Sequence, residues 1–451
     1  MEFKQTPDSG TDAIKYLSAA KGAAEYIRTF QVEDSNGIYW SQDQSADLSL
    51  YSGASGILLF FLQLFQVTGD PSYMKDAERA GDYIVSHFQK EPFPLPVESP
   101  SPYAFLRHNE CSLYLGGFSG IAFSLLNLHK YSNINTYRDT AYRLTEYVVS
   151  QAAEAEGGVY WNGYSGIFHD AGVILYLIHA SEYFHEPKWL DIAAKAGCAI
   201  ISNGININGD STLYLCVQDR LGNYQTEDFT FMPNFEHGTA GISYAIAALA
   251  KATNDPRFIA AAKRGANYLI EQSVATEHGR LIPYLLPENP GNIFYLGYCN
   301  GPVGSSRPFL LLYNLTHEQK YLDMYNNLMR GMIDFGVPEQ RSAGYWNNFN
   351  LCCGTAGFIG CFMDAYDTLK EECYKDLMVR SGNVLLANAQ VDGQTVSWSS
   401  ALVRLEPDNI SNVNGYMNGN AGIGKALLHL YTFLEQKNSV QLIKLPDEVI
   451  C

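Results

Sequence analysis

The chain has 451 residues, of which 47% are hydrophobic and 17% are charged, and its formal net charge at pH 7 is −17. This composition supplies enough apolar material for a large folded core and differs from that of a disordered chain. The negative charge argues against nucleic-acid binding, because a phosphate backbone requires a surface rich in lysine and arginine. It also disfavours binding to anionic membrane surfaces.

The first residues, MEFKQTPDSGTDAIKYLSAAKG, lack the apolar segment of a signal peptide. The most apolar stretch, GILLFFLQLF at 56–65, is much shorter than the roughly 20 residues that span a bilayer. We therefore expect a cytoplasmic protein without a membrane span. Its nine cysteines would stay reduced there, and cysteines that cluster are candidates for metal binding or catalysis.

Taken in chain order, the predicted elements repeat one signature: a glycine, two residues, a second glycine and an apolar run. Six copies read SGASGILLFFLQL (52–64), GGFSGIAFSLLNL (116–128), HGTAGISYAIAAL (237–249), NGPVGSSRPFLLL (300–312), CGTAGFIGCFMDA (353–365) and NGNAGIGKALLHL (418–430). A degenerate copy, HDAGVILYLIHA at 169–180, is the third of seven and has His169 in place of its first glycine. Each apolar run predicts a buried helix.

Amphipathic segments lie between the copies, for example PSYMKDAERAGDYIVSHF (71–88) and RFIAAAKRGANYLIEQSV (257–274). Each repeat is therefore predicted as an outer amphipathic helix, a loop and an inner buried helix. Seven such hairpins that close on themselves form an all-α fold, an α/α toroid, in which the glycine-rich starts of the inner helices converge. We treat residues 1–451 as one domain, with a core at about 10–435 and a loosely held tail at 444–451.

Short aromatic pieces precede several copies: GIYW (37–40), GVYW (158–161), GYWN (344–347) and VSWS (396–399). We interpret them as short strands or turns that cross the mouth of the toroid. Ordinary surface loops are the alternative.

Three cysteines stand at the starts of the fifth and sixth copies: Cys299 in GYCNGPVG, and Cys352 and Cys353 in LCCGTAG. If the repeats are equivalent, neighbouring inner helices begin side by side, and Cys299 would lie near the pair. Three thiolates suit Zn²⁺, with Zn–S distances of about 2.3 Å and one open tetrahedral position. Helix N-termini also favour the thiolate form, whereas a disulfide between adjacent cysteines needs a strained ring.

The remaining cysteines are interpreted as structural. We expect Cys111, Cys198, Cys216, Cys361 and Cys373 to be buried packing residues, because free cysteine is among the most buried residue types. Cys451 belongs to the predicted tail.

The full pattern resembles a known family. Seven Gly-x-x-Gly helical repeats, with cysteine elements in the fifth and sixth, are similar to the LanC-like proteins, which include the lanthionine synthetase C cyclases and their eukaryotic relatives. The resemblance covers about residues 10–435. It implies an α/α toroid with zinc at its mouth. In the cyclases, zinc activates a peptide cysteine, which adds to dehydroalanine or dehydrobutyrine in the same peptide and forms a thioether (lanthionine) ring.

By this resemblance, the first zinc cysteine of the family falls on Cys299 and the second on Cys352. The usual third ligand is a histidine, and that position is Cys353 here, which resembles the three-cysteine sites of some cyclase subgroups. The added negative charge of such a site should make a bound thiolate more reactive. The family histidine of the fourth repeat falls on His237, the expected acid/base catalyst.

Other family positions differ in this sequence. The arginine four residues before the first zinc cysteine is Tyr295, and the tyrosine just after that cysteine is Asn300. The aspartate that usually precedes the third repeat falls near Ser165. His169 and Asp170 lie close to that position and could replace the aspartate.

A zinc-dependent peptide cyclase is the leading hypothesis. His237 would transfer a proton, and Asp170 or His169 would orient the site. The partners would be a precursor peptide or a small thiol, and a separate dehydratase would supply the dehydroamino acid. The structural alternative for His237 is a loop histidine that caps a helix, and that for Asp170 is an ordinary acid at a helix N-terminus. Glu236 is either a partner of His237 or a solvated neighbour.

Two other functions stay open. One is a LanC-like protein that binds zinc and a thiol such as glutathione without cyclase activity, which the missing arginine and tyrosine favour. The other is a sugar hydrolase or isomerase on a helical toroid, with paired carboxylates and an aromatic cleft. Its candidate acids and cleft tryptophans are Glu227, Asp228, Glu236, Trp40, Trp161 and Trp346.

Overall fold

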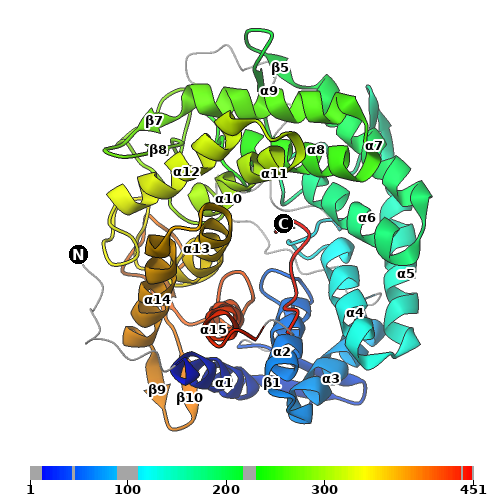
Figure 1. The fold of residues 1–451 in the computed structure, drawn as a ribbon. Coiled ribbons are helices and arrows are strands. Elements are labelled where there is room, and N and C mark those ends of the chain that lie inside the picture. Colours follow the sequence, from blue (N-terminus) through cyan, green and yellow to red (C-terminus); the bar gives the residue numbers. More distant parts are fainter. Residues whose placement is uncertain (1–12, 43–45, 89–109, 217–229, 438–439, 449–451) are drawn as a thin grey trace. The chain divides into compact units, whose positions relative to one another are not determined.

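The computed structural model describes residues 13–42, 46–88, 110–216, 230–437 and 440–448. Helices dominate these ranges, and small antiparallel hairpins supply the strands (Figure 1). None of the described helices is long and apolar enough to cross a bilayer.

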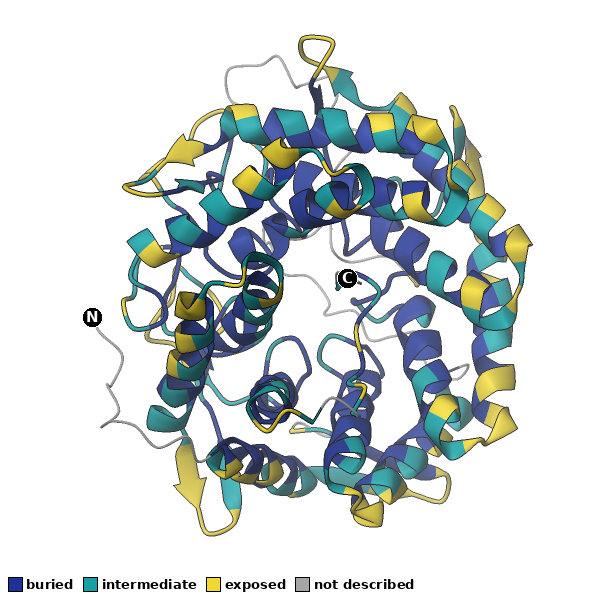
Figure 2. Cartoon of the chain, in the orientation of Figure 1, coloured by how far each residue is buried: buried dark blue, intermediate teal, exposed yellow. Residues whose placement is uncertain are grey.

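Among the described residues, two sets of helices alternate along the chain. The amphipathic helices are α1 (Ile14–Arg28), α3 (Pro71–His87), α5 (Asn135–Ser150), α7 (Pro187–Ser202), α9 (Pro256–Gln272), α12 (Gln319–Asp334) and α14 (Glu372–Ala387). The buried helices are α2 (Ala54–Thr68), α4 (Phe118–Ser132), α6 (Asp170–Phe184), α8 (Thr239–Thr253), α10 (Pro302–Ser305), α11 (Arg307–Thr316), α13 (Thr355–Leu369) and α15 (Asn420–Leu434). Figure 2 shows the buried set in dark blue over most of its length. The predicted alternation of amphipathic and buried helices is thus confirmed, and the fifth buried helix is split into α10 and α11. The predicted order within a hairpin is wrong, because α2, α6, α8 and α13 pack mainly against the amphipathic helix that follows each of them, and α15 packs against α1.

The Gly-x-x-Gly motif is explained by a close backbone approach. An ideal Cβ at Gly238 would lie 2.0 Å from the carbonyl oxygen of Met232, and one at Gly241 would lie 1.9 Å from that of Phe235. The loop folds back over the first turn of α8 and leaves no room for a side chain.

A compact turn joins several buried helices to the next amphipathic helix. Gly69 ends α2 in the left-handed conformation, Asp70 caps α3 by accepting a hydrogen bond from the Ser72 N–H at 2.9 Å, and Pro71 is the first helical residue. Glycine after a helix, an acidic cap and proline at the first position each favour this geometry.

Six two-stranded antiparallel hairpins complete the regular structure of the described ranges. They pair β1 (Gln31–Asp34) with β2 (Gly37–Trp40), β3 (Ala153–Ala155) with β4 (Gly158–Tyr160), β5 (Ile205–Asn206) with β6 (Thr212–Leu213), β7 (Val274–Ala275) with β8 (Arg280–Leu281), β9 (Gln390–Asp392) with β10 (Thr395–Ser397), and β11 (Ser400–Ala401) with β12 (Ile410–Ser411). Short strands are confirmed at 37–40, 158–161 and 396–399, as β2, β4 and β10, and their predicted place across the mouth of the toroid stays a prediction. In the fourth aromatic piece, Tyr345 forms an isolated bridge with Ser342.

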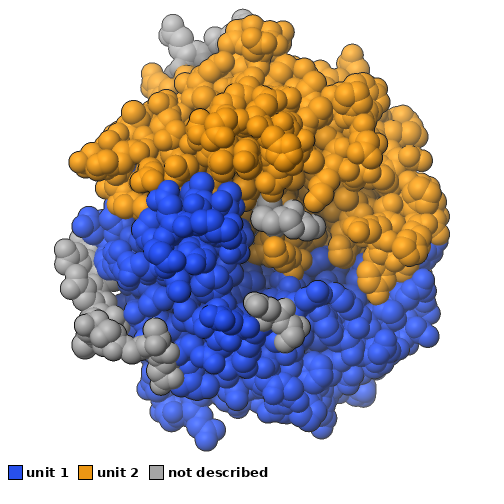
Figure 3. All heavy atoms as spheres, in the orientation of Figure 1, with its two compact units in different colours: residues 1–98, 120–142, 335–443 blue, residues 99–119, 143–334, 444–451 orange. Residues whose placement is uncertain are grey.

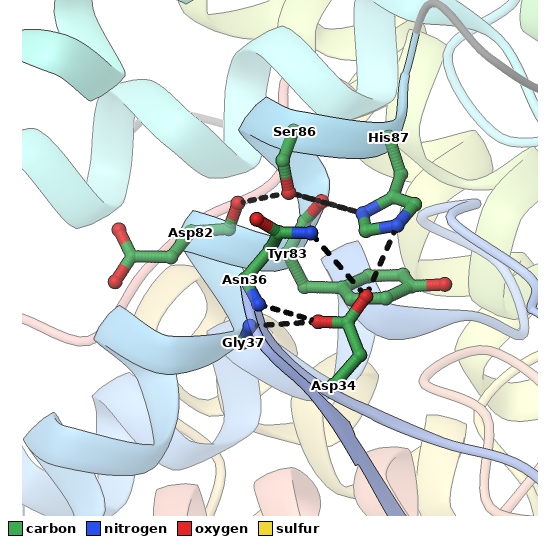
Figure 4. A network of polar contacts seen from close by, with 7 residues as sticks. All are labelled: Asp34, Asn36, Gly37, Asp82, Tyr83, Ser86 and His87. Carbon is green, nitrogen blue, oxygen red and sulfur yellow. Dashed lines mark hydrogen bonds and ion pairs between the residues drawn. The ribbon is translucent and has the colours of Figure 1, made fainter.

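These strands lie against amphipathic helices: β2 contacts α3, β4 contacts α7 and β10 contacts α1. Figure 4 shows how the first hairpin is fastened. The Asp34 carboxylate accepts hydrogen bonds from the backbone N–H groups of Asn36 and Gly37 at 2.7 and 3.0 Å, which closes the turn. The same carboxylate lies 3.2 Å from Nε2 of His87, at the end of α3.

The chain divides into two compact units, coloured separately in Figure 3. Unit 1 comprises residues 1–98, 120–142 and 335–443, and unit 2 comprises residues 99–119, 143–334 and 444–451. In unit 1, α15 packs against α1, α2 and α13, so the first and last helices of the chain are neighbours. In unit 2, α8 packs against α6, α9 and α11. The interpretation as one domain stays a prediction.

The prediction of a loosely held tail is wrong for residues 444–448. Leu445 and Asp447 are buried there, and Asp447 forms an ion pair with Arg307. A buried carboxylate with a charged partner fastens this segment to unit 2. Residues 449–451, which include Cys451, lie outside the described residues.

Candidate functional site

The loops that precede α6, α8 and α10 in unit 2 are joined by backbone hydrogen bonds. The N–H of Ile167 donates to the carbonyl of Glu236 at 3.0 Å, and the N–H of Glu236 donates to the carbonyl of Cys299 at 2.8 Å. These bonds bring together the stretches that carry His169, His237 and Cys299. The prediction that neighbouring buried helices begin side by side is therefore confirmed within this unit.

Unit 1 repeats this arrangement. The N–H of Cys352 donates to the carbonyl of Met417 at 3.0 Å, and the N–H of Met417 donates to the carbonyl of Tyr51 at 2.8 Å. Each of these residues stands two positions before the first glycine of its copy, as Glu236 and Cys299 do in unit 2. Cys299 and Cys352 therefore occupy equivalent positions of the repeat.

The Cys352–Cys353 pair has the spacing of two thiol ligands. Cys352 is buried, Cys353 is half-buried, and their sulfur atoms lie 3.6 Å apart. A disulfide requires about 2.05 Å, so the two cysteines are not bonded to each other. Two sulfur atoms on one tetrahedral zinc, each at about 2.3 Å, lie roughly 3.8 Å apart. The N–H of Cys353 donates to Oδ1 of Asn350 at 2.9 Å, which orients the pair at the start of α13.

Cys299 is likewise buried and forms no disulfide with another described cysteine. The cysteines that could serve as metal ligands are Cys299 of unit 2 and the Cys352–Cys353 pair of unit 1. The three sulfur donors fit zinc, which binds thiolates in tetrahedral sites and needs no redox partner.

His237 has a carboxylate partner in the same loop. Its Nε2 atom lies 2.8 Å from Oε2 of Glu236, and both side chains are buried. Burial alone would lower the pKa of His237, but the charge of Glu236 and a hydrogen bond with Cys216 raise that pKa to about 10. The interpretation of Glu236 as a partner of His237 is confirmed over that of a solvated neighbour. Cys216, interpreted as packing, contacts this histidine.

His169 and Asp170 sit at the start of α6 and are both buried. Burial, with a smaller contribution from the charge of His237, lowers the pKa of His169 to about 3. Burial raises the pKa of Asp170 to about 7, against the effect of backbone N–H groups that donate to it from Trp161 and Asn162 at 3.2 and 3.3 Å. The Asp170 carboxylate therefore holds the preceding loop in place.

The sequence profile described as "Lanthionine synthetase C-like protein" matches residues 44–443. The chain belongs to the lanthionine synthetase C-like family. None of the curated proteins compared with it matches.

Solved structures establish the fold of this LanC-like chain. A structure titled "Nisin cyclase" superposes with a TM-score of 0.62 at 16% identity, over 94% of this chain and 93% of that one. A sugar epimerase from a ruminal bacterium superposes with a TM-score of 0.50 at 11% identity, over 93% and 98% of the two chains. At these identities the likeness shows the fold alone. The predicted all-α toroid is confirmed.

The three residues at which this LanC-like chain differs from the expected family pattern are all buried. Tyr295, at the position where the resemblance led us to expect an arginine, is buried and stacks on Tyr284, with ring centroids 4.4 Å apart. Asn300 is buried beside Cys299. Ser165 is buried and donates its backbone N–H to the Cys216 carbonyl at 2.7 Å.

The predicted aromatic cleft of the sugar hypothesis is wrong for two of its tryptophans. Trp40 is buried and stacks on Phe61 at 5.0 Å, and Trp346 is buried with its indole N–H donating to the Ala401 carbonyl at 2.8 Å. The partly buried Trp161 donates its indole N–H to the Val148 carbonyl at 2.7 Å. The Trp40 ring packs on another ring, and the indole N–H groups of Trp161 and Trp346 donate to backbone carbonyls. These side chains therefore have structural contacts of their own. Of the candidate acids, Glu227 and Asp228 lie outside the described residues.

The other cysteines are only partly as predicted. Cys111 and Cys361 are buried, and burial raises the pKa of Cys111 to about 12, which keeps it an unreactive thiol. Cys198 is half-buried and Cys373 is exposed, so the prediction of buried packing is wrong for these two.

Sequence reasoning did not single out one further group. Glu277, His278 and Asp334 form a second set of residues that could hold a metal ion. Asp334 accepts hydrogen bonds from the backbone N–H of His278 at 2.8 Å and from the Thr276 hydroxyl. These contacts assign Asp334 to closing the turn between β7 and β8.

Proposed function

We propose that this LanC-like chain is a zinc-dependent enzyme that adds a thiol to a dehydroamino acid and closes thioether rings in a peptide. The observation that carries the proposal is the presence of three candidate metal ligands, Cys299, Cys352 and Cys353, a donor set suited to zinc, in a chain of this family. Two of these cysteines occupy equivalent positions of the repeat, which supports a common role.

Zinc at these cysteines would lower the pKa of a substrate thiol and present it as a thiolate with its sulfur exposed to the alkene. When the sulfur–carbon bond forms, the alkene π electrons move to the α carbon, which then takes a proton. Protonated His237 can supply that proton from its imidazole ring, and the proton lost by the thiol restores the imidazolium. Sulfur–carbon and carbon–hydrogen bonds form, one π bond and one S–H bond break, and the step needs no oxidant.

Glu236 supports this assignment by keeping His237 charged. Its carboxylate raises the pKa of His237 to about 10 despite burial, so the imidazole is protonated at neutral pH. The buried surroundings limit competing proton exchange with water. Asp170 and His169 are proposed to hold the neighbouring loop in place.

The proposed substrate is a peptide that already contains dehydroalanine or dehydrobutyrine, together with a cysteine. The name of the nisin cyclase structure refers to ring closure, and we extend that reaction type to this chain. A separate enzyme would dehydrate the peptide. Reduced thiols are required throughout, which fits a cytoplasmic location.

One alternative retains the metal group without ring closure. A zinc protein that binds glutathione or another small thiol is favoured by Tyr295, whose stacked, buried ring cannot supply the charge of the family arginine. The sugar-enzyme alternative loses the support of its aromatic cleft, because Trp40 and Trp346 are buried.

The test uses two substrates. A peptide with one dehydroalanine and one cysteine is incubated with the protein and then alkylated, since a closed ring no longer gains the mass of the alkylating agent. A second peptide with dehydroalanine alone is incubated with glutathione, and addition is read as a mass gain. Ring closure supports cyclisation, whereas glutathione addition alone assigns a thiol transferase. Thiol-dependent binding without either product would overturn the enzyme proposal.

A matched pair of variants ties the reaction to the cysteines. Cys352→Ala with Cys353→Ala should abolish turnover. Cys361→Ala, which changes a buried cysteine of the same copy outside the metal group, should retain it. Turnover that survives in the double variant would contradict the assignment of these ligands.

A further inference from the structure

The segment 444–448 carries a carboxylate into the interior of unit 2. Asp447 is fully buried, and its oxygens accept hydrogen bonds from the hydroxyl of Tyr114 at 2.7 Å and from that of Tyr298 at 2.5 Å. The guanidinium of Arg307 donates to the Asp447 carboxylate at 3.1 Å and to its backbone carbonyl at 2.8 Å. We refer to Asp447, Arg307, Tyr114 and Tyr298 as the Asp447 cluster.

Such a cluster is not a generic packing contact. A carboxylate taken out of water is strongly disfavoured unless charged and hydrogen-bonding partners replace the lost hydration. Here one guanidinium and two hydroxyl groups surround Asp447, which makes the geometry directional. Removing the charge of Asp447 would leave Arg307, largely buried itself, without its carboxylate.

The Asp447 cluster contacts residues that are sequence neighbours of the proposed catalytic and ligand residues. Tyr298 immediately precedes Cys299 in the chain, and Phe235 immediately precedes Glu236. The Arg307 guanidinium lies over both rings, 5.0 Å from the centroid of Tyr298 and 5.3 Å from that of Phe235, and the two rings are 5.3 Å apart.

The third loop is connected through Tyr114. Its ring packs on Phe168 with centroids 5.4 Å apart, and Phe168 immediately precedes His169. The rings of Phe168 and His237 in turn form a T-shaped pair, with centroids 5.7 Å apart. Each of the three loops thus has an aromatic residue that rests on the Asp447 cluster or on one of its members.

We propose that Asp447 is a positioning residue for the proposed thiol-addition site: through Arg307, Tyr114 and Tyr298 it fixes the loops of His169, His237 and Cys299 relative to one another. The proposal rests on the proposed function for the meaning of those loops. Its structural content, that segment 444–448 holds the loops in register, is independent of any metal.

The first test is hydrogen exchange in metal-free, full-length protein, read by mass spectrometry. Asp447→Asn keeps the shape of the side chain and removes its charge. Peptides that contain Ile167 and Glu236, whose N–H groups form the bonds between loops, should exchange roughly tenfold faster in this variant. Exchange at the wild-type rate would overturn the proposal.

The variant Asp76→Asn is the control that distinguishes a positioning effect of Asp447 from a general loss of stability. Asp76 pairs with Arg28 at 2.7 Å in unit 1, so this variant also removes an Arg–carboxylate pair. It should lower the melting temperature without accelerating exchange of the two peptides, and equal acceleration in both variants would count against a positioning role. Should Asp447→Asn not fold, Tyr114→Phe removes one hydroxyl donor and should still give roughly threefold faster exchange.

The second test measures cobalt affinity by the thiolate-to-cobalt absorption band. Asp447→Asn should weaken binding roughly tenfold, whereas Asp76→Asn should bind like wild type. If wild-type protein binds no cobalt or zinc, the proposed function fails, while the exchange experiment still decides whether Asp447 positions the loops. Accelerated exchange with unchanged cobalt affinity would contradict the link between Asp447 and the proposed site.

Discussion

At the residue scale, three buried titratable side chains in unit 2 have pKa values that their surroundings move apart. Burial is the main cause of the pKa shifts of Asp170 and His169, and it favours the neutral form of each side chain. His237 is equally buried, yet the Glu236 carboxylate at 2.8 Å reverses the effect and favours the charged form. Of these two histidines, His237 is the one that is protonated at neutral pH, and it is the proton donor of the proposed reaction.

The role of His237 can be tested by His237→Asn. The variant should retain its zinc, because His237 is outside the proposed ligand set, while the rate constant of thiol addition falls by roughly 10²- to 10⁴-fold. Stopped-flow or quenched turnover with saturating substrate, alongside metal analysis, makes the comparison. A variant with wild-type turnover would remove His237 from the mechanism.

The low pKa of His169 makes a prediction about stability. The folded protein keeps His169 neutral down to a pKa of about 3, whereas the unfolded chain takes up a proton near pH 6.5. The unfolded state therefore binds more protons between these values, and this group's contribution to stability falls as the pH decreases through that window. At pH 5 this effect lowers the free energy of unfolding by roughly 2 kcal/mol relative to neutral pH, and His169→Gln should abolish that pH-dependent loss.

The measurement is the free energy of unfolding of both proteins by denaturant titration between neutral pH and about pH 4.5. The difference between the two proteins should change with pH, since any constant cost of the substitution cancels from the slope. Parallel curves would show that His169 titrates normally in the folded protein.

At the scale of elements, the Gly-x-x-Gly loop determines how each buried helix begins. Gly241→Ala should destabilise the protein by roughly 2–4 kcal/mol, because the added Cβ would lie 1.9 Å from the Phe235 carbonyl. Gly360→Ala is the matched control within α13, where an ideal Cβ meets no described atom within 4 Å. It should be neutral or stabilising by up to about 1 kcal/mol. Equal effects in thermal or denaturant unfolding would contradict the close-approach explanation.

The helices were predictable because their information is local. Apolar periodicity, repeated glycines and the acid–proline start of α3 and α9 all lie within a few residues of the element that they specify. The loop positions of Cys299 and Cys352 followed from the same repeat. Their equivalence needed no knowledge of tertiary structure.

Partners that come from distant segments were not predictable. Asp447 meets Tyr114 and Tyr298, which are far from it in the sequence, and the short segment KLPDEVIC gives no local sign that its aspartate is buried. In the sequence, Trp40 could equally be a surface aromatic in a loop, and only the structure shows that it stacks on Phe61. One signal was present: Arg307 directly precedes the apolar run PFLLL, and a charged residue next to a buried helix is rarely buried without a partner.

At the scale of the whole molecule, the family assignment and the toroid fold rest on a match over residues 44–443 and on a solved structure superposed over 94% of the chain. The proposed activity depends on much less of the chain. In the proposal, three cysteines and one histidine–glutamate pair supply the reacting and metal-binding groups, and the helical repeats hold their loops in place. Metal binding and ring closure can therefore be tested separately from the fold.

The most direct test of the central claim is the metal content of the purified protein, measured by inductively coupled plasma mass spectrometry on material prepared without chelator. The account predicts about one zinc per chain in the wild type and in Cys361→Ala, and loss of that zinc in the Cys352→Ala, Cys353→Ala double variant. A wild-type protein without zinc, or a double variant that keeps it, would contradict the account.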